Sequence, residues 1–131
     1  SILVSANKYS IGDVLQLWTR TLKTGTAGGA TIRYRVNTSN TLTGSTLLAT
    51  AAFSLASTLS QEAHRFLSLR TGNILAIFPA ATSATYGNVS SGVTETTTTV
   101  DPTADFYLFI TIQLANSGDS VVSSSYFLSR I

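Results

Sequence analysis

A two-residue hydrophobic repeat near the end of the chain constrains the fold more than any other feature. Every second residue from Phe106 to Leu114 is apolar. Successive side chains of a β-strand point to opposite faces, so a strand here has one wholly apolar face. Its other face begins with Tyr107 and Phe109 before it turns polar, which is typical of a strand whose second face meets a loop or another chain. The repeat predicts a strand over 106–114.

Two earlier segments also have strand character. From Thr31 to Val36, apolar residues alternate with two arginines, which indicates a half-buried strand. The run between Asp13 and Leu22 is rich in large apolar and β-branched residues, and Trp18 is the largest anchor that it offers. We expect a strand in each segment.

Two later segments complete the predicted strands. The short apolar run Asn73–Phe78 ends at Pro79, a residue that cannot donate a hydrogen bond to a sheet. The last strand is expected over 120–131, after a turn formed by residues 116–119.

The stretch from Leu47 to Leu69 permits two interpretations. Apolar residues at helical spacing would line one face of a helix, and Thr58 with Gln61 resembles a capping box. Several serine and threonine residues interrupt this pattern, however, and their side chains compete for backbone hydrogen bonds. We therefore favour two strands around a loop or a single helical turn, and keep the helix as the alternative.

Two segments are expected to be loops. Lys23–Ala30 is rich in glycine, which permits the positive φ values that hairpin loops need, so we expect a mobile hairpin loop there. Ala80–Asp101 shows little sustained apolar alternation, so we expect a long surface excursion, and loops of that length are usually functional or flexible.

The composition also favours β-structure. Charged residues make up only 11% of the chain, against roughly 25% in an average soluble domain. The surface must therefore be covered by serine, threonine, asparagine and glycine, which suit strands and turns better than solvated helices. About eight short strands in 131 residues predict one domain over 1–131, an all-β antiparallel sandwich of the jelly-roll type. The Cys-Trp-Cys signature of immunoglobulin domains is missing.

Several classes of function are disfavoured by the composition. The absence of cysteine excludes disulfides, thiolate metal sites and cysteine nucleophiles. We expect no transmembrane helix, signal peptide or membrane insertion, because no long apolar stretch and no basic leader occur. The basic residues are scattered and the net charge is only +2, which argues against nucleic acid as a partner. Because methionine is also absent, we expect a processed chain or a piece of a longer one.

Candidates for catalysis are few. His64 is the only histidine, so a base-assisted hydrolase would depend on it, yet its segment contains no nucleophile elbow. We therefore expect a surface or loop histidine. Gly118-Asp119-Ser120 resembles the Gly-Asp-Ser block of some lipases and esterases, but in those enzymes the histidine follows the block far downstream. A β-turn is the better interpretation.

The remaining polar motifs also favour structural interpretations. Of the six carboxylates, only Asp101 and Asp105 lie close together, and they lack the spacing of an EF-hand calcium site. Asp101 before Pro102 is more simply a turn opener, and paired acids for glycoside cleavage would have to be assembled by the fold. The glycines at 25–29 match neither a P-loop nor a dinucleotide fingerprint. We expect no catalytic residue, cofactor or metal, and hence no enzyme.

Arg33 and Arg35 would form a basic strip for polyanions if Tyr34, between them, faced the same way. The alternation directs Tyr34 to the opposite side. We therefore expect a solvated or interfacial sheet face.

The order of these features resembles a family of phage proteins. The opening SILVSANKYSIGDVLQLWTRTLKTGTAGGATIRYRVNT and the late DPTADFYLFITIQLANSGDSVVSSSYFLSRI are similar to the small C-terminal or accessory jelly-roll domains of tailed-bacteriophage virion proteins, such as tail-fibre tips, tail-needle knobs and head decorations. In those domains a Gly-Asp turn leads a strand, and a Gly/Thr loop carries it to a strand with basic residues. The similarity spans nearly the whole chain as a pattern of turns and strands.

The resemblance implies a jelly-roll fold like that of tumour necrosis factor or viral knobs. It also implies a non-enzymatic structural protein of the virion, the extracellular phage particle. Its leading form is a homotrimeric distal knob of a tail fibre, needle or spike, with other virion proteins and a host cell-surface glycan or protein as partners. One alternative is a capsid decoration (cement) protein that stabilises the head. A further alternative is a carbohydrate-binding module, which normally shows a solvent-facing row of Trp or Tyr, whereas Trp18 stands alone in the sequence.

Candidate contact residues follow from these expectations. Tyr107 and Phe109 are candidates for the subunit interface, because aromatic residues are enriched at interfaces. Exposed loops on a rigid β-scaffold commonly carry recognition. The candidates for contact with the receptor in these loops are Lys23, Thr26, Tyr86 and Asn88.

Overall fold

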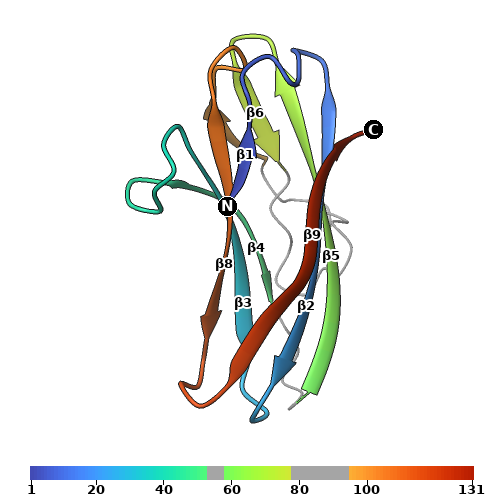
Figure 1. Ribbon diagram of the computed structural model, residues 1–131, viewed down its shortest axis with the longest axis vertical. Helices are drawn as coiled ribbons and strands as arrows, with labels where there is room; N and C mark the ends of the chain where they lie inside the picture. The colour runs from blue at the N-terminus through green and yellow to red at the C-terminus, as the bar shows by residue number, and fades with distance from the viewer. Residues whose placement is uncertain (53–57, 78–94) are drawn as a thin grey trace.

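The chain folds into two antiparallel β-sheets that face each other (Figure 1). The computed structural model describes residues 1–52, 58–77 and 95–131, which contain nine strands. One sheet has four strands in the order β1, β8, β3, β4, and the other has five in the order β7, β6, β5, β2, β9. The predicted all-β antiparallel sandwich is confirmed.

The strand bounds define the two layers. The four-stranded sheet contains β1 (Ile2–Val4), β8 (Phe106–Leu114), β3 (Ala30–Asn37) and β4 (Thr46–Ala52). The five-stranded sheet contains β7 (Thr96–Thr99), β6 (Ile74–Ile77), β5 (Thr58–Arg70), β2 (Val14–Thr24) and β9 (Ser120–Arg130). The predicted strands near 73–78 and 120–131 are thus β6 and β9, except that Phe78 lies outside the described residues.

The two-residue repeats place the core between the sheets. β3 and β8 pair with Tyr34 opposite Ile110 and Val36 opposite Leu108, so their apolar faces coincide. Tyr34 and Leu108 are each 1% exposed, whereas the intervening residues at the start of β8 are half-buried. The predicted strands over 31–36 and 106–114, and the faces assigned to them, are confirmed.

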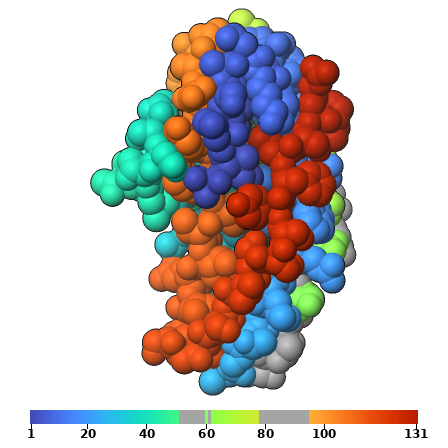
Figure 2. Space-filling view, in the orientation of Figure 1, coloured from blue at the N-terminus to red at the C-terminus, as the bar shows by residue number. Residues whose placement is uncertain are grey.

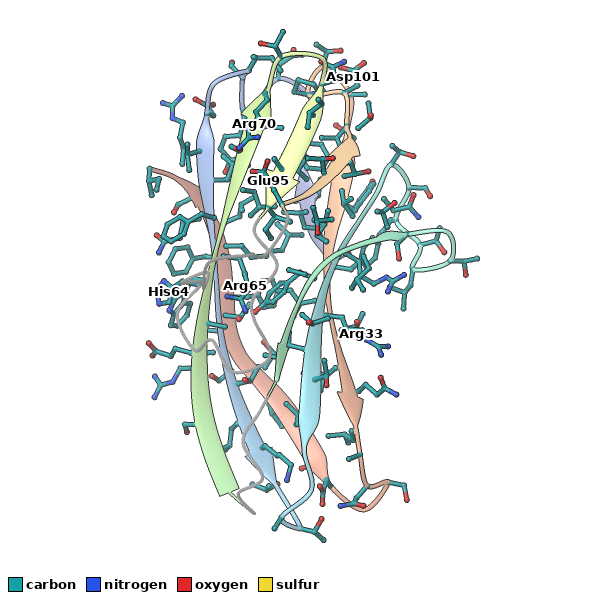
Figure 3. The ribbon with its side chains drawn as sticks, turned by 180° about the vertical axis from the view of Figure 1, so that it is seen from behind. Arg33, His64, Arg65, Arg70, Glu95 and Asp101 are labelled. Atoms are coloured by element: carbon teal, nitrogen blue, oxygen red, sulfur yellow. The ribbon has the colours of Figure 1, made fainter. Side chains whose placement is uncertain are left out.

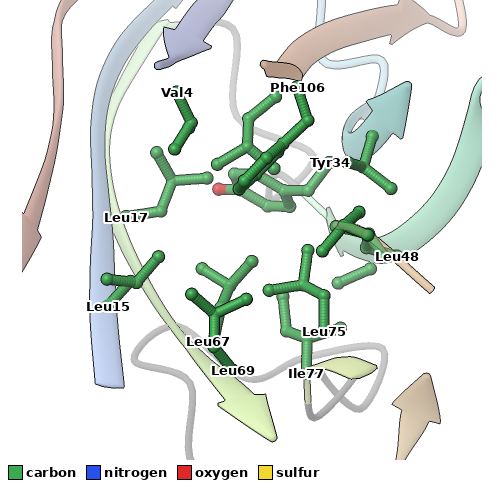
Figure 4. Packing of buried hydrophobic residues seen from close by; sticks show 14 of the residues in the cluster. Val4, Leu15, Leu17, Tyr34, Leu48, Leu67, Leu69, Leu75, Ile77 and Phe106 are labelled. Carbon is green, nitrogen blue, oxygen red and sulfur yellow. The ribbon is translucent and has the colours of Figure 1, made fainter. Parts of the chain in front are cut away.

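β2 and β5 complete the core from the five-stranded sheet. In β2 the buried residues are those at odd positions, from Leu15 to Lys23. Trp18 has an even position and faces outward, so it does not anchor the core as its size suggested. The interior contains smaller aliphatic side chains instead, each contributing roughly 2 kcal/mol when buried. Figure 4 shows them, among others Leu15, Leu17, Leu67, Leu69, Leu75 and Ile77.

The ambiguous stretch from Leu47 to Leu69 forms two strands, β4 and β5, which lie in different sheets. The favoured interpretation is confirmed, and the described parts of this stretch contain no helix. Residues 53–57, which join the two strands, lie outside the described residues.

The connection between β2 and β3 differs from the prediction. These strands belong to different sheets and do not pair, so residues 25–29 cross between the layers and the predicted hairpin is wrong. Lys23 and Thr24 still belong to β2. Gly25 has a φ of 129°, a conformation that side chains rarely adopt, so the crossover needs glycine at this position.

Part of the predicted surface excursion is a strand. Thr96–Thr99 forms β7 beside β6, and Val100 after it is buried. Four threonines suit a strand by propensity but give no apolar alternation, so this edge strand carried no periodic signal. Residues 78–94 lie outside the described residues. The short β1 was not predicted either, and the jelly-roll order of the connections stays a prediction.

Candidate functional site

The outward face of the five-stranded sheet carries a cluster of ring side chains on three neighbouring strands. Trp18 on β2 lies directly opposite Phe127 on β9, and their rings stack with centroids 5.2 Å apart. On β5, the His64 ring meets Trp18 edge-on with centroids 6.4 Å apart. Phe66, two residues along β5, is 44% exposed and Phe127 is 48% exposed. We call these four residues the aromatic cluster.

His64 is held on this face by its neighbours. The Gln16 side-chain amide donates to His64 Nδ1 at 2.8 Å, and the ring is half-buried against Trp18. Figure 3 shows His64 and Arg65 projecting to opposite sides of β5. His64 therefore lies on the outward face of a strand, so the predicted surface position is correct and the predicted loop position is wrong.

The outward face of the four-stranded sheet holds the two aromatic residues predicted for a subunit interface. Tyr107 and Phe109 are half-buried there. Leu3 on β1 lies opposite Tyr107 and is 46% exposed, and Leu47 on β4 is 41% exposed. The outward orientation agrees with the sequence alternation, and the role in an interface stays a prediction.

The two arginines of β3 lie on the same outward face. Arg35 is tied to the loop before β4, because its Nε donates to Ser45 Oγ at 2.7 Å and its Nη2 donates to Ser45 O at 2.9 Å. Tyr34 is buried on the opposite side, which confirms the expectation that it does not flank Arg33 and Arg35. The arrangement favours a structural role for Arg35.

A buried ion pair joins two crossovers at one end of the sandwich. The side chains of Lys23 and Asp119 are 0% exposed, and Lys23 Nζ lies 3.1 Å from Asp119 Oδ2. Lys23 Nζ also donates to Thr26 O at 2.6 Å. Asp119 Oδ1 accepts from Thr26 N at 2.6 Å and from Thr26 Oγ1 at 2.8 Å. We call these three residues the crossover clasp.

The electrostatics of the clasp favour the charged carboxylate. The hydrogen bond from the Thr26 backbone is the main cause that lowers the pKa of Asp119 below its usual value. Burial opposes this shift, while the Thr26 hydroxyl and Lys23 reinforce it. Asn116 extends the clasp by donating from Nδ2 to Thr26 Oγ1 at 2.7 Å. Asp119 N donates to Asn116 O at 3.2 Å, so the turn predicted before β9 is present.

The predicted receptor contacts fall into three groups. Lys23 is inaccessible, and its expected place in an exposed loop is wrong, because it continues the inward-facing positions of β2. Thr26 lies in an exposed crossover, but its hydroxyl and backbone hold Asp119. Tyr86 and Asn88 lie outside the described residues.

The two aspartates considered for calcium serve separate turns. Asp101 Oδ1 accepts from the Thr103 hydroxyl at 2.7 Å and from Thr103 N at 2.9 Å, and the hydroxyl is the main cause that lowers the Asp101 pKa. Asp105 Oδ1 accepts from Ala6 N at 2.8 Å. Asp101 is thus a turn opener, as predicted. Among the described residues, no three His, Cys, Asp or Glu side chains gather where a metal ion would fit.

Sequence reasoning did not single out Arg65, which lies between the sheets and is 1% exposed. Its Nη1 donates to His64 O at 3.0 Å and its Nη2 to Thr50 O at 3.3 Å, while no acceptor for its Nε occurs among the residues that the structure describes. The guanidinium carbon lies 5.5 Å from the centroid of the Tyr34 ring. Burial lowers the pKa of Arg65 and raises the pKa of Tyr34. From Ala63 to Leu69 the odd positions of β5 are buried, and this alternation was the sequence signal for Arg65.

Comparison with known proteins identifies no family. No protein-family model matches the chain, and no curated protein or solved structure matches it. No helix in the described ranges has the length and apolar character needed to cross a membrane. A function therefore has to be argued from the sandwich and its outward faces.

Proposed function

We propose that this chain is a non-enzymatic structural protein of a bacteriophage virion, the trimeric distal knob of a tail fibre, needle or spike. One observation carries the proposal: both sheets expose large apolar side chains on their outward faces. Phe66 and Phe127 lie on one face, and Leu3 and Leu47 on the other. Exposed apolar patches on a folded domain mark contacts with other molecules. A domain with such surfaces on both faces is suited to assembly.

We assign the contact of the trimer to the outward face of the four-stranded sheet. Tyr107 and Phe109 offer aromatic rings beside the exposed Leu3, and aromatic residues are enriched where subunits meet. The remaining surface, poor in charge and rich in serine and threonine, supports a role on an extracellular particle. The host cell surface, a glycan or a protein, would then meet the parts of the knob that the trimer leaves exposed.

Analytical ultracentrifugation of the chain and of a Tyr107→Ser, Phe109→Ser double variant tests this proposal. The unaltered chain is expected to form assemblies with a multiple of three copies, and the double variant to lose the threefold assembly. Val14→Ser is a matched control, because Val14 is 37% exposed on the other sheet. A threefold assembly that survives the double substitution, or no threefold assembly at any concentration, contradicts the proposal. A monomer that orders only on added capsids points to the head-decoration alternative.

A carbohydrate-binding module is a second candidate, and the aromatic cluster favours it. The sequence shows no row of aromatic residues around Trp18. The fold, however, places Phe127 and Phe66 on the same face as Trp18, with the Gln16 amide beside them. Calorimetric titration of glycans into the chain and into a Trp18→Ala variant tests this function. Binding by the unaltered monomer that disappears in the variant supports it, and equal results for both proteins contradict it.

A further inference from the structure

The longest edge strand of the sandwich is β9. It has 11 residues and pairs only with β2 among the described strands, whereas the edge strands β1, β7 and β4 have three, four and seven residues. Figure 2 shows it as a continuous band along the surface. Proteins normally protect such edges with charges, prolines or short strands. β9 contains no proline, and its single charged residue is Arg130 at the end.

The side chains of this edge are apolar and accessible. Val122 is 59% exposed, Tyr126 is 51% exposed and Phe127 is 48% exposed. Val122 and Phe127 face outward, opposite Leu22 and Trp18 of β2. Tyr126 faces the neighbouring edge of the other sheet. It lines a small cavity of about 70 Å³ together with Ser1, Ile2, Ile110, Ile112 and Ser123. Both sides of the β9 edge therefore offer apolar contact.

We propose that β9 pairs antiparallel with β9 of a second copy of this chain, about a twofold axis. The two five-stranded sheets then join into one continuous sheet. This contact lies on a different surface from the threefold contact of the proposed function, and it does not depend on that function.

The backbone of β9 determines which groups point to the free edge. Ile131 N donates to Val14 O, and every second residue of an antiparallel strand bonds to the same neighbour. The pairing of β9 with β2 skips Ser124, because Arg20 lies opposite Ser125 and Thr21 opposite Ser123. Following the alternation through this shift, the residues directed to the free edge are Val121, Ser123, Tyr126, Leu128 and Arg130.

One register satisfies these free groups in both copies. It places Val121 opposite Leu128 of the second copy and Ser123 opposite Tyr126 of the second copy, and the twofold axis repeats both pairs. Each hydrogen-bonded pair exchanges two bonds, so about eight backbone hydrogen bonds form. Val121 and Leu128 already pack inward against the core within one copy. In this register, side chains that face the core of one copy therefore lie next to side chains that face the core of the other copy.

The same register matches the outward face and the irregular point of the strand. Val122 lies opposite Phe127 of the second copy, a pairing of a β-branched residue with an aromatic ring that stabilises sheets. The extra residue Ser124 faces Ser125 of the second copy, so the bulge of one strand meets the bulge of the other. The irregularity that weakens β9 against β2 thus does not disturb the register between copies.

Charge and area also fit a pair of copies. Arg130 lies opposite Asp119 of the second copy and far from the other Arg130, so no like charges face each other. Ten paired residues span about 34 Å, and two sheets about 10 Å apart with their outer side chains are roughly 20 Å deep. The edge then buries on the order of 700 Å² per copy, close to the about 800 Å² per partner of a stable interface.

Cysteine cross-linking tests the register. The natural chain has no cysteine, so Val122→Cys and Phe127→Cys variants each carry a single thiol. In the proposed register their Cα atoms lie about 4.5 Å apart across the axis, within the disulfide range. The oxidised mixture is expected to give a dimer with one copy of each variant. Either variant alone is expected to stay unlinked, because identical positions then lie about 17 Å apart. No link in the mixture, or equal links in the single samples, overturns the proposal.

A second experiment separates this contact from the threefold one. Val122→Lys is expected to weaken the pairing at least tenfold in sedimentation equilibrium. Leu22→Lys is the control, because Leu22 lies opposite Val122 on the same face but one strand away from the edge; thermal unfolding checks that both variants fold. If the unaltered chain forms a dimer, the result supports β9 pairing and contradicts the threefold contact. A trimer supports the threefold contact and contradicts β9 pairing, and a hexamer supports both contacts. A monomer at every concentration overturns both.

Discussion

Replacing Arg65 with methionine is expected to leave the free energy of unfolding unchanged or to raise it by about 1 kcal/mol, because buried ionic groups are often replaceable by apolar ones of similar volume. Arg65 is 1% exposed. The contacts that stabilise it are hydrogen bonds to the carbonyls of His64 and Thr50 and the face of the Tyr34 ring.

The opposing contributions are of similar size. Loss of two hydrogen bonds from a charged donor costs about 1.5–3 kcal/mol each, and loss of the contact with the Tyr34 ring costs about 1–2 kcal/mol. Methionine removes the penalty for a desolvated cation, which amounts to several kcal/mol. Its own burial adds roughly 2 kcal/mol. The balance is close to zero or slightly favourable.

Urea unfolding of the native chain, Arg65→Met and Arg65→Ala, followed by Trp18 fluorescence, measures this balance. The alanine variant also loses packing, so it is expected to be about 3 kcal/mol less stable than the native chain. If the methionine variant loses more than about 2 kcal/mol and unfolds as easily as the alanine variant, the charge itself stabilises the core and the reasoning is refuted.

The crossover clasp supports two further predictions. The pKa of Asp119 in the folded chain lies below its unfolded value of 3.8. The stability that the charged Asp119 contributes is therefore present above that pH and is lost as the pH falls through the folded pKa. Asp119→Asn is expected to lower the thermal stability at neutral pH and to reduce its decline in acid. Gly25→Ala is expected to destabilise the fold by about 2 kcal/mol in urea unfolding, because an added Cβ would lie 2.9 Å from Asp119 Cα at a φ of 129°. Equal stability of this variant contradicts the close approach.

The two-residue periodicity predicted the strands and their faces well. In β3 and β8, alternation alone identified the buried Tyr34 and the outward Tyr107, because the pleat fixes which side chains share a face. The same rule applies to Lys23, which continues the odd positions of β2, but its glycine-rich surroundings suggested a loop. A buried lysine needs a carboxylate beside it, and here that carboxylate is Asp119, which lies far from Lys23 in the sequence. The periodicity of a single strand does not reveal such a partner.

Sheet membership and cross-strand register lay beyond the sequence pattern for a physical reason. Alternation states which residues share a face, but not which strand lies next to which. β2 and β3 are consecutive and still lie in different sheets. Trp18 acquires its stacking partner Phe127 only through the pairing of β2 with β9. The candidate surfaces therefore emerged from the fold, while their individual side chains were visible in the sequence.

Native mass spectrometry of the intact chain over a dilution series tests most directly whether the outward apolar faces bind other copies. Assemblies of defined stoichiometry that persist on dilution are predicted. A single chain at every concentration, with no larger species, would contradict self-association through either outward face and through the β9 edge.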